Sequence, residues 1–301
     1  MTKVKSPLLS LGAKGTLGDE LTFRESRGVS IAEKTPIPAY RRTLPQMYQR
    51  WTYQDYAWLW GVLDPATKQV FASAGSRYHL TGFQYWMKTR LENLTHMGGW
   101  WKLDDAHLVA IADSSRNNNT GVNVGCVAAG GLIGGAAEFD GVNDYIDLGT
   151  SASIQFATVM TLHLFLRLTP FSGSSGFIVT NRWNDGFGNQ GYVFFRQGGA
   201  NNVQFIRYLD GVNLSIAGAF TPGVWHHWAM AKTSTHMHLY RDGLPAAAPV
   251  ADARTIKTQG HIYLGTAIPG FTPLMTMDNA YLLGYWAFPA EVARWAERRY
   301  P

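Results

Sequence analysis

Short apolar stretches alternate with glycines at the start of the chain. Between residues 8 and 32, apolar stretches such as 21–23 and 29–31 are separated by single glycines. This spacing is typical of short strands joined by tight turns, because glycine adopts the backbone angles that such turns require. We therefore expect two or three short strands in this region.

The hydrophobic period then changes to that of helices. Thr43, Asp64 and Thr81 are each placed to cap a helix, and Pro65 stands at the first helical position after Asp64. The second helix is expected to run through Phe71. The apolar positions at helical spacing are Leu44, Tyr48, Trp51, Trp58, Leu59 and Val62 in the first helix, and Phe83, Met87, Leu91 and Leu94 in the third.

From residue 100 onward the pattern is that of antiparallel strands. Asp-Gly pairs, which favour tight hairpin turns, occur at 140–141, 185–186, 210–211 and 242–243. The expected strands include 161–166, 191–195, 203–208, 225–231, 236–240 and 261–264. Residues 288–296 form a short amphipathic pattern, which predicts a terminal helix packed across an edge. The predicted fold is mainly β, an antiparallel two-sheet sandwich after a small β-hairpin and helical region.

Composition and charge narrow the class of protein. The 301 residues are 46% apolar, 13% aromatic and 16% charged, and Cys126 is the single cysteine, so neither disorder nor a disulfide scaffold describes the chain. Residues 1–97 hold 13 Lys/Arg against 7 Asp/Glu, and residues 98–301 hold 13 against 14. We therefore expect a basic region, 1–97, and a neutral domain, 98–301. The sequence has no concentrated run of Lys and Arg, so we expect no nucleic-acid partner. It also has no apolar run long enough to predict a membrane span, and no ordinary secretion signal is expected.

The C-terminal part resembles the laminin G-like, concanavalin A-like jelly-roll family over roughly residues 98–301. The segments that carry the resemblance occur in the family's order at 101–104, 113–115, 134–148, 223–229, 239–243, 262–265 and 278–281. The resemblance implies a jelly roll whose two sheets enclose one core. It leaves function open, because this fold hosts lectins, adhesion modules, glycosidases and structural parts.

The N-terminal part resembles a segment of bacteriophage virion proteins that are tail-associated or decorate the capsid. The matching motifs are 12–18, 21–23, 42–46, Arg50, Trp58, Trp60, Leu63 and 81–84. The resemblance implies a virion component that is made in the host cytoplasm and released by lysis. Its partners would be other virion proteins.

Residues 138–143 resemble the Glu-x-Asp-x-x-Glu strand of laminarinase-type glycosidases, so they show whether the chain carries the carboxylates of such an enzyme. Glu138 and Asp140 match that pattern, but Asn143 stands where the acid/base carboxylate belongs. Retaining glycosidases need two carboxyl groups about 5 Å apart. We therefore expect no enzyme, and a polysaccharide hydrolase is the weakest of three hypotheses.

Two metal sites are conceivable from the residue types. Oxygen ligands for calcium could come from Asp113, Asp140 and Asp144, whose spacing matches no EF-hand loop and which are equally expected as turn formers. Zinc could bind His227, His236 and His238, although surface or hydrogen-bonded histidines are the favoured interpretation. No cofactor is expected apart from the calcium alternative.

Aromatic residues give the ligand and assembly hypotheses. Some rings could stack on sugar faces, and the candidates are Trp183, Tyr192, Phe195, Tyr208, Trp225, Tyr240 and Tyr263. Most rings, including Trp225 and Trp228, are nevertheless expected in the core. The predicted glycan-binding residues are Trp183, Asn184, Asp185 and Asn189, because a loop tryptophan among polar side chains is the least suited to burial. The predicted assembly contacts are Trp51, Trp58, Trp60 and Phe83, because Lys and Arg do not interleave with these rings.

The leading hypothesis is a non-enzymatic virion structural protein. Residues 1–97 would attach to the particle, and the jelly roll would project as a decoration, spike or fibre module that binds host-surface glycans. Low charge and many aromatic residues favour a homo-oligomer. The alternative is a cell-surface or secreted lectin-like adhesin.

Overall fold

The structure is a computed structural model of the 301-residue chain. It describes residues 15–17, 21–26, 29–34, 44–93, 97–115, 117–169, 175–181, 183–184, 189–209, 212–256, 259–268, 271, 273–287 and 289–297. The chain divides into two compact units, Met1–Thr52 and Tyr53–Pro301. Each unit is described by itself.

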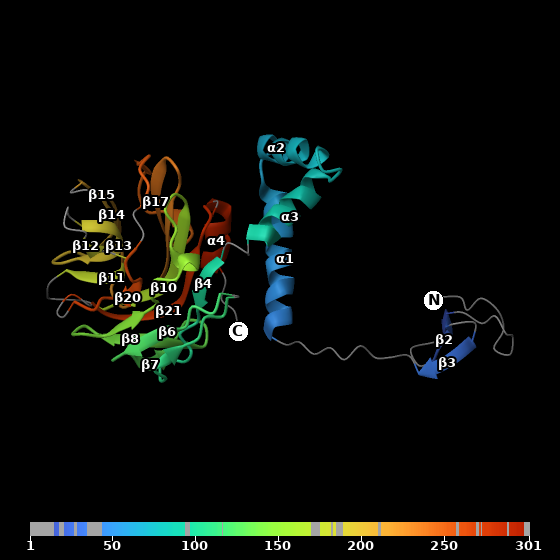
Figure 1. Ribbon diagram of the computed structural model, residues 1–301, viewed down its shortest axis with the longest axis horizontal. Coiled ribbons are helices and arrows are strands. Elements are labelled where there is room, and N and C mark those ends of the chain that lie inside the picture. The colour runs from blue at the N-terminus through green and yellow to red at the C-terminus, as the bar shows by residue number, and fades with distance from the viewer. Residues whose placement is uncertain are drawn as a thin grey trace. The chain divides into compact units, whose positions relative to one another are not determined.

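The first unit contains an antiparallel sheet of short strands, as the glycine pattern predicts. The sheet has the order β1–β2–β3, and its strands are β1 (Gly15–Leu17), β2 (Leu21–Ser26) and β3 (Val29–Lys34) (Figure 1). This unit also holds the net charge of the chain. Residues 1–52 carry 9 Lys/Arg against 4 Asp/Glu, whereas residues 53–301 carry 17 of each.

The three predicted helices are confirmed as α1 (Leu44–Val62), α2 (Pro65–Ser76) and α3 (Gly82–Asn93). The Thr67 amide donates to Asp64 Oδ1 over 2.9 Å, and the Thr67 hydrogen bonds lower the pKa of Asp64. At α3 the Gln84 amide donates to Thr81 Oγ1 while the Thr81 amide donates to Gln84 Oε1. This reciprocal pair is a capping box, which satisfies two backbone donors that the helix start leaves unpaired.

The helices enclose a small aromatic core. Tyr56 and Trp86 are buried in it, and the Trp86 indole donates to the Tyr56 carbonyl over 2.9 Å. Trp60 packs edge-on against Phe83 with a centroid distance of 5.9 Å. The structure therefore places these two predicted assembly residues, both partly buried, against the helical core.

The helical core belongs to the same compact unit as the jelly roll, and the domain boundary expected near residue 97 stays a prediction. Arg90 of α3 lies 3.9 Å from Glu291 of the terminal helix α4 (Pro289–Glu297), and both side chains are buried. Ala290 packs against the helical cluster. These contacts join the helices to α4 at the C-terminal end of the chain. The distribution of charge along the sequence gives no sign of them.

The rest of this unit is a two-sheet antiparallel jelly roll, which confirms the predicted fold class. The first sheet, here called the helix-covered sheet, has the order β18–β17–β16–β10–β21–β8–β7, with β19 paired to β17 and β4 paired to β21 (Figure 1). Its strands are β4 (Met97–Trp101), β7 (Val127–Gly130), β8 (Gly135–Asp140), β10 (Met160–Leu168), β16 (Trp225–Lys232), β17 (His236–Arg241), β18 (Leu244–Pro245), β19 (Val250–Ala251) and β21 (Leu274–Leu283).

The second sheet has the order β15–β14–β13–β11–β20–β9–β6–β5, with β12 paired to β13. Its strands are β5 (Ala110–Ile111), β6 (Gly121–Val124), β9 (Tyr145–Asp147), β11 (Gly176–Thr180), β12 (Trp183–Asn184), β13 (Asn189–Gln197), β14 (Asn202–Leu209), β15 (Val212–Ala219) and β20 (Tyr263–Gly265). A short 3-10 turn, Ala152–Ile154, precedes β10.

The core lies between the two sheets, and alternation along each strand decides which side chains enter it. On β10, Leu162, Leu164 and Leu166 belong to the core, so the residues between them face the outer side of the sheet. Trp101 and Trp228 are fully buried in the same core. The outer side of β10 can therefore carry residues that do not pack in the core between the sheets.

Turn chemistry fixes the hairpins at the predicted Asp-Gly pairs that the structure describes. Asp242 and Gly243 have φ angles of 51° and 82° between β17 and β18, and Gly141 has a φ of 83° after β8. Glycine tolerates such angles without the steric cost that other residues meet. The pairs at 185–186 and 210–211 lie outside the described residues. None of the described helices has the length and apolarity needed to span a bilayer.

Candidate functional site

The outer face of the helix-covered sheet has one half that lies beneath α4. There His163 of β10 stacks on Tyr281 and on Trp295, with centroid distances of 4.3 and 4.2 Å and interplanar angles of 9° and 12°. Two nearly parallel rings at these distances must occupy opposite faces of the imidazole. Val292 of α4 and Leu283 of β21 are buried in the same layer. This half is therefore a second, smaller core.

The histidines of the covered half are neutral at physiological pH. His227 Nε2 lies 3.4 Å from His163 Nδ1, and both rings are buried. Burial lowers the pKa of His163 well below its ordinary value and lowers the pKa of His227 to about 4, because a charged imidazole loses its hydration there. His163 and His227 are therefore two uncharged rings beneath α4.

The other half of the same face carries polar side chains in a single row. Strand register places Glu138 of β8 beside Thr276 of β21, Thr276 beside Arg167 of β10, and Arg167 beside Trp225 of β16. Adjacent strands lie about 4.8 Å apart, so this row crosses four strands with neighbouring side chains in reach of one ligand.

A groove of about 260 Å³ follows this row. It is lined by Glu138, Arg167, Thr169, Gly223, Leu274, Met275 and Thr276. Arg167 Nη2 donates to Thr276 Oγ1 over 3.1 Å, and its guanidinium lies 5.2 Å from the centre of the Trp225 ring. Both contacts hold the guanidinium in place. The Glu138 carboxylate is exposed and has no hydrogen bond or ion pair with the described residues.

The row combines the groups that recognise hydroxyl-rich ligands. A carboxylate accepts hydrogen bonds from hydroxyls and a guanidinium donates them, whereas Thr276 is buried and holds Arg167 in position. Trp225 is half-buried and offers apolar surface beside these groups. Along β8, Asp140 follows Glu138 on the same side, but its Oδ1 accepts the Val142 amide over 2.8 Å and so serves the turn after β8.

The predicted calcium ligands each organise a local turn. The Asp113 carboxylate accepts the amides of Trp100, Ser115 and Asn119 and the Ser115 hydroxyl. Asp144 Oδ2 accepts the Asp140 amide over 2.8 Å, and burial raises the pKa of Asp144. Among the residues that the structure describes, no three His, Cys, Asp or Glu side chains form a group suited to a metal ion.

The three histidines proposed for zinc are divided between two environments. His227 lies in the covered half next to His163, whereas His238 stacks on Tyr240 and Trp286 with centroid distances of 6.1 and 5.9 Å. His236 Nδ1 lies 2.9 Å from Thr235 Oγ1. The described contacts are therefore those of packed and hydrogen-bonded histidines.

The predicted glycan-binding side chains lie outside what the structure describes. Trp183, Asn184 and Asn189 are described only as strand backbone, and Asp185 is not described. Trp51 is likewise described only as helix backbone. Trp58 is 48% exposed, and the Arg294 guanidinium lies 5.3 Å from its ring centre.

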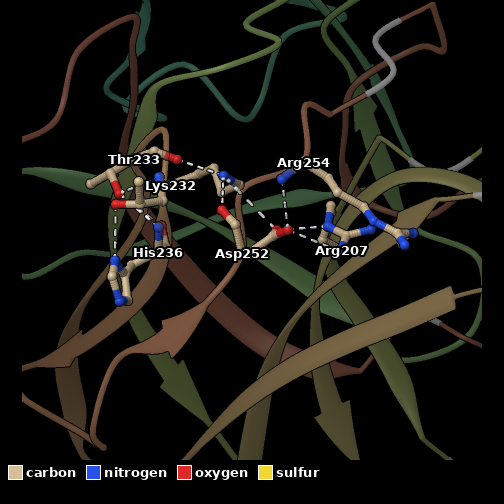
Figure 2. A network of polar contacts seen from close by, with 7 residues as sticks. Arg207, Lys232, Thr233, His236, Asp252 and Arg254 are labelled. Carbon is tan, nitrogen blue, oxygen red and sulfur yellow. Dashed lines mark hydrogen bonds and ion pairs between the residues drawn. The ribbon is translucent and has the colours of Figure 1, made fainter.

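A buried ion network at the end of β14 and β16 was not predicted. Arg207 Nε and Nη2 donate to the two carboxylate oxygens of Asp252 over 2.7 and 3.0 Å, and Lys232 Nζ donates to the Asp252 carbonyl over 2.8 Å. Figure 2 shows Asp252 between these two cations, with the Arg254 amide also directed at its carboxylate. Burial lowers the pKa of Lys232. The network links Asp252, which follows β19, to Arg207 in one sheet and to Lys232 in the other.

The groove residues were also missed as a set, although one signal was present. Arg167 interrupts the run of apolar residues in β10, and a charged residue in such a strand is rarely buried without a partner, so it indicates a surface position. Trp225 was expected in the core with Trp228. The structure confirms a fully buried Trp228 and places Trp225 on the opposite side of β16, because three residues along a strand reverse the side.

Comparison with known proteins supports the fold and leaves the ligand open. Residues 140–276 match the family model described as the concanavalin A-like lectin/glucanases superfamily. No curated protein matches the chain. The matched residues include Asp140, Arg167, Trp225 and Thr276 but begin after Glu138.

Solved structures of toxin binding domains share the fold at low sequence identity. The binding domain of Paraclostridial Mosquitocidal Protein 1 aligns with a TM-score of 0.57 and 15% identity, covering 68% of this chain and 52% of that domain. The botulinum neurotoxin serotype G binding domain gives 0.55 and 12%, covering 66% and 50%. The serotype D ligand binding domain in complex with N-acetylneuraminic acid gives 0.55 and 11%, covering 68% and 51%.

The chain thus spans about half the length of the solved domains it matches. At these identities the likeness concerns the fold and not the ligand. Residues 140–276 are thus similar to the concanavalin A-like lectin/glucanases superfamily, and the two-sheet jelly roll of this chain is consistent with that similarity.

Proposed function

We propose that the jelly roll is a non-enzymatic binding module that holds a neutral glycan in the groove between Glu138 and Arg167. The observation that carries this proposal is the row of carboxylate, hydroxyl, guanidinium and indole groups that strand register aligns on one open face. Sugar hydroxyls would donate to Glu138 and accept from Arg167. The C–H face of the sugar would pack against the edge of the row at Trp225.

The charges of the groove favour a neutral ligand over an acidic one. Glu138 and Arg167 carry opposite charges, so the groove has no net charge to attract an anion. A carboxylate-bearing sugar could pair with Arg167 but would meet Glu138 across the groove. A sugar with hydroxyl groups alone can use both residues.

The comparisons support a binding role in a general way. The similar solved structures are binding domains of clostridial toxins, and one of them is a complex with N-acetylneuraminic acid. The family description covers both lectins and glucanases. We favour binding over hydrolysis because Asn143 replaces the last carboxylate of the glucanase-like strand and Asp140 serves a turn.

A glycan array tests the proposal, with the full chain and two variants applied in parallel. Trp225→Ala removes the indole beside the groove, next to Arg167, and Trp58→Ala removes an exposed indole of the helical region as a matched control. We expect neutral glycans to bind the parent and Trp58→Ala, and their affinity for Trp225→Ala to fall at least about tenfold, a loss of about 1.4 kcal/mol. An array without neutral glycan binding, or equal binding by both variants, would refute the groove.

We further propose that the chain is a virion structural protein that displays this module. Two observations favour it: the resemblance of the N-terminal motifs to phage virion proteins, and the separate unit of residues 1–52 that holds the whole net charge. A basic unit joined in sequence to a neutral one suits attachment to an acidic surface of a particle. Mass spectrometry of purified particles should detect peptides of this chain, and their absence would favour a host adhesin.

A further inference from the structure

Both sheets of the jelly roll end at the same side of the sandwich. β7 is the last strand of the helix-covered sheet, and β5 is the last strand of the second sheet in the part of the chain that the structure describes. The link between β6 and β7 passes from one sheet to the other through Gly125 and Cys126. We call the surface formed by residues 106–111 and 121–130 the β7 edge.

The β7 edge exposes a cluster of apolar side chains. The exposed members are Leu108, Val109, Val122, Val124 and Val127, with Val109 the most exposed at 73%. A hollow of about 340 Å³ lies among them and is lined in part by Leu108, Val109 and Val127. Isolated apolar residues are ordinary on a surface, but several around one hollow mark an interaction site.

The β7 edge also lacks the features that normally prevent strand pairing. Residues 106–112 and 117–137 contain no Asp, Glu, Lys or Arg, and β7 itself has the sequence Val-Ala-Ala-Gly. Free edges in natural proteins are usually protected by charges, proline or a covering segment. The opposite edge of the same sheet follows that rule, because β18 contains Pro245, which cannot donate to a neighbouring strand.

We propose that the β7 edge is the interface with a second copy of this chain, formed by antiparallel pairing of two β7 strands around a two-fold axis. An isologous interface places each surface against itself, so a neutral apolar edge meets a neutral apolar edge and no charge is left unpaired. Ala128, Ala129 and Gly130 allow the two backbones to approach. The pairing extends the helix-covered sheet across both copies and covers the valine side chains.

The test measures the mass of the full chain by analytical ultracentrifugation between about 1 and 100 μM. The parent should be a dimer that dissociates on dilution. Ala128→Lys places like charges near the two-fold axis and should weaken the dimer at least tenfold. Val70→Lys, at a side chain of α2 that is 65% exposed, is the matched control and should leave the dimer unchanged.

Thermal unfolding of each variant shows whether the fold is retained. If Ala128→Lys does not fold, Val109→Lys takes its place, because its highly exposed side chain lies on the same surface. A monomeric parent at every concentration, or a folded edge variant that dimerises as the parent does, would overturn the proposal. The outcome is independent of glycan binding, since neither substituted residue lines the groove.

Discussion

Two halves of one sheet face differ in chemistry although the same strands carry both. On the outer side of β10, His163 lies beneath α4 between two aromatic rings, and Arg167, four residues later, lies in the open groove. On β21 the change from Leu283 to Thr276 is one of polarity, because both side chains are buried. The difference shows that the covering helix, and not the strand, decides whether this face is core or surface.

The covered half tolerates only uncharged groups. Burying a charged group without a partner costs several kcal/mol, and the two histidines remain neutral there because burial lowers their pKa values. The open half keeps Glu138 and Arg167 in contact with water. A ligand that replaces this water must supply hydrogen bonds of its own, which is why the groove suits a glycan.

The largest expected effect is on stability in the covered half. Leu283→Ala should reduce the free energy of unfolding by about 2 to 5 kcal/mol, because the side chain is buried under α4 and its removal leaves a cavity. Glu138→Gln, at an exposed position of the open half, should change it by less than about 0.5 kcal/mol. Urea unfolding measures both. Equal effects would show that α4 does not form a core on this face.

The second effect is the pH dependence of stability. In the unfolded chain His227 titrates near 6.5, whereas in the folded chain its pKa is about 4, so between these values the unfolded state binds more protons. Stability should therefore fall as pH decreases from 6.5 to 4, by up to about 3 kcal/mol for this histidine. Unfolding of the parent and of His227→Phe at several pH values measures the contribution.

Asp278 changes the pH dependence of stability in the opposite direction to His227, so its contribution must be separated from that of the histidine. Burial raises its pKa to about 6, so the folded state binds more protons between pH 6 and 3.8, and this carboxyl stabilises the fold as pH falls. Both proteins contain Asp278, so the difference between their pH profiles reports His227. Parallel profiles would contradict a neutral, buried His227.

The third effect is on ligand affinity in the open half. Arg167→Ala removes the guanidinium that contacts both Thr276 and Trp225, so glycan affinity should fall about tenfold or more. Calorimetric titration with a glycan selected on the array measures the loss. His163→Ala, on the same side of the same strand, is the matched variant. If it loses affinity as Arg167→Ala does while remaining folded, the groove is not the binding site.

The smallest effect concerns Glu138. Glu138→Gln keeps the shape and one acceptor oxygen but removes the charge, so affinity for a neutral glycan should fall only about threefold to tenfold. The same titration detects it. A gain in affinity for acidic glycans in this variant would support the claim that Glu138 repels them, because Arg167 would then be the charged residue left in the groove. A complete loss of binding would instead indicate that Glu138 is the principal ligand contact.

Much of the fold could be predicted because local rules decide it. The alternation of leucines with other residues in β10 predicts a strand whose leucine side faces the core, and Asp242-Gly243 predicts the hairpin that follows β17. The caps Asp64 and Thr81 predict the starts of two helices. Each of these signals lies within a few residues of the element that it specifies.

The groove could not be predicted in the same way. Glu138, Thr276 and Arg167 come from distant parts of the sequence, and only the register of β8, β21 and β10 makes them neighbours. The position of α4 decides which part of the face stays open, and the prediction that this helix packs across an edge does not give its place over the face of β10. For the same reason the partial burial of Trp60 and Phe83 follows from packing between helices and not from their spacing.

The most direct test of the groove is an experimental structure of the full chain with the glycan that the array selects. We predict a sugar ring against Trp225 with its hydroxyls hydrogen-bonded to Glu138 and Arg167, on the half of the sheet that α4 leaves open. A glycan bound elsewhere, for instance around residues 183–189, with the groove unchanged, would contradict this account.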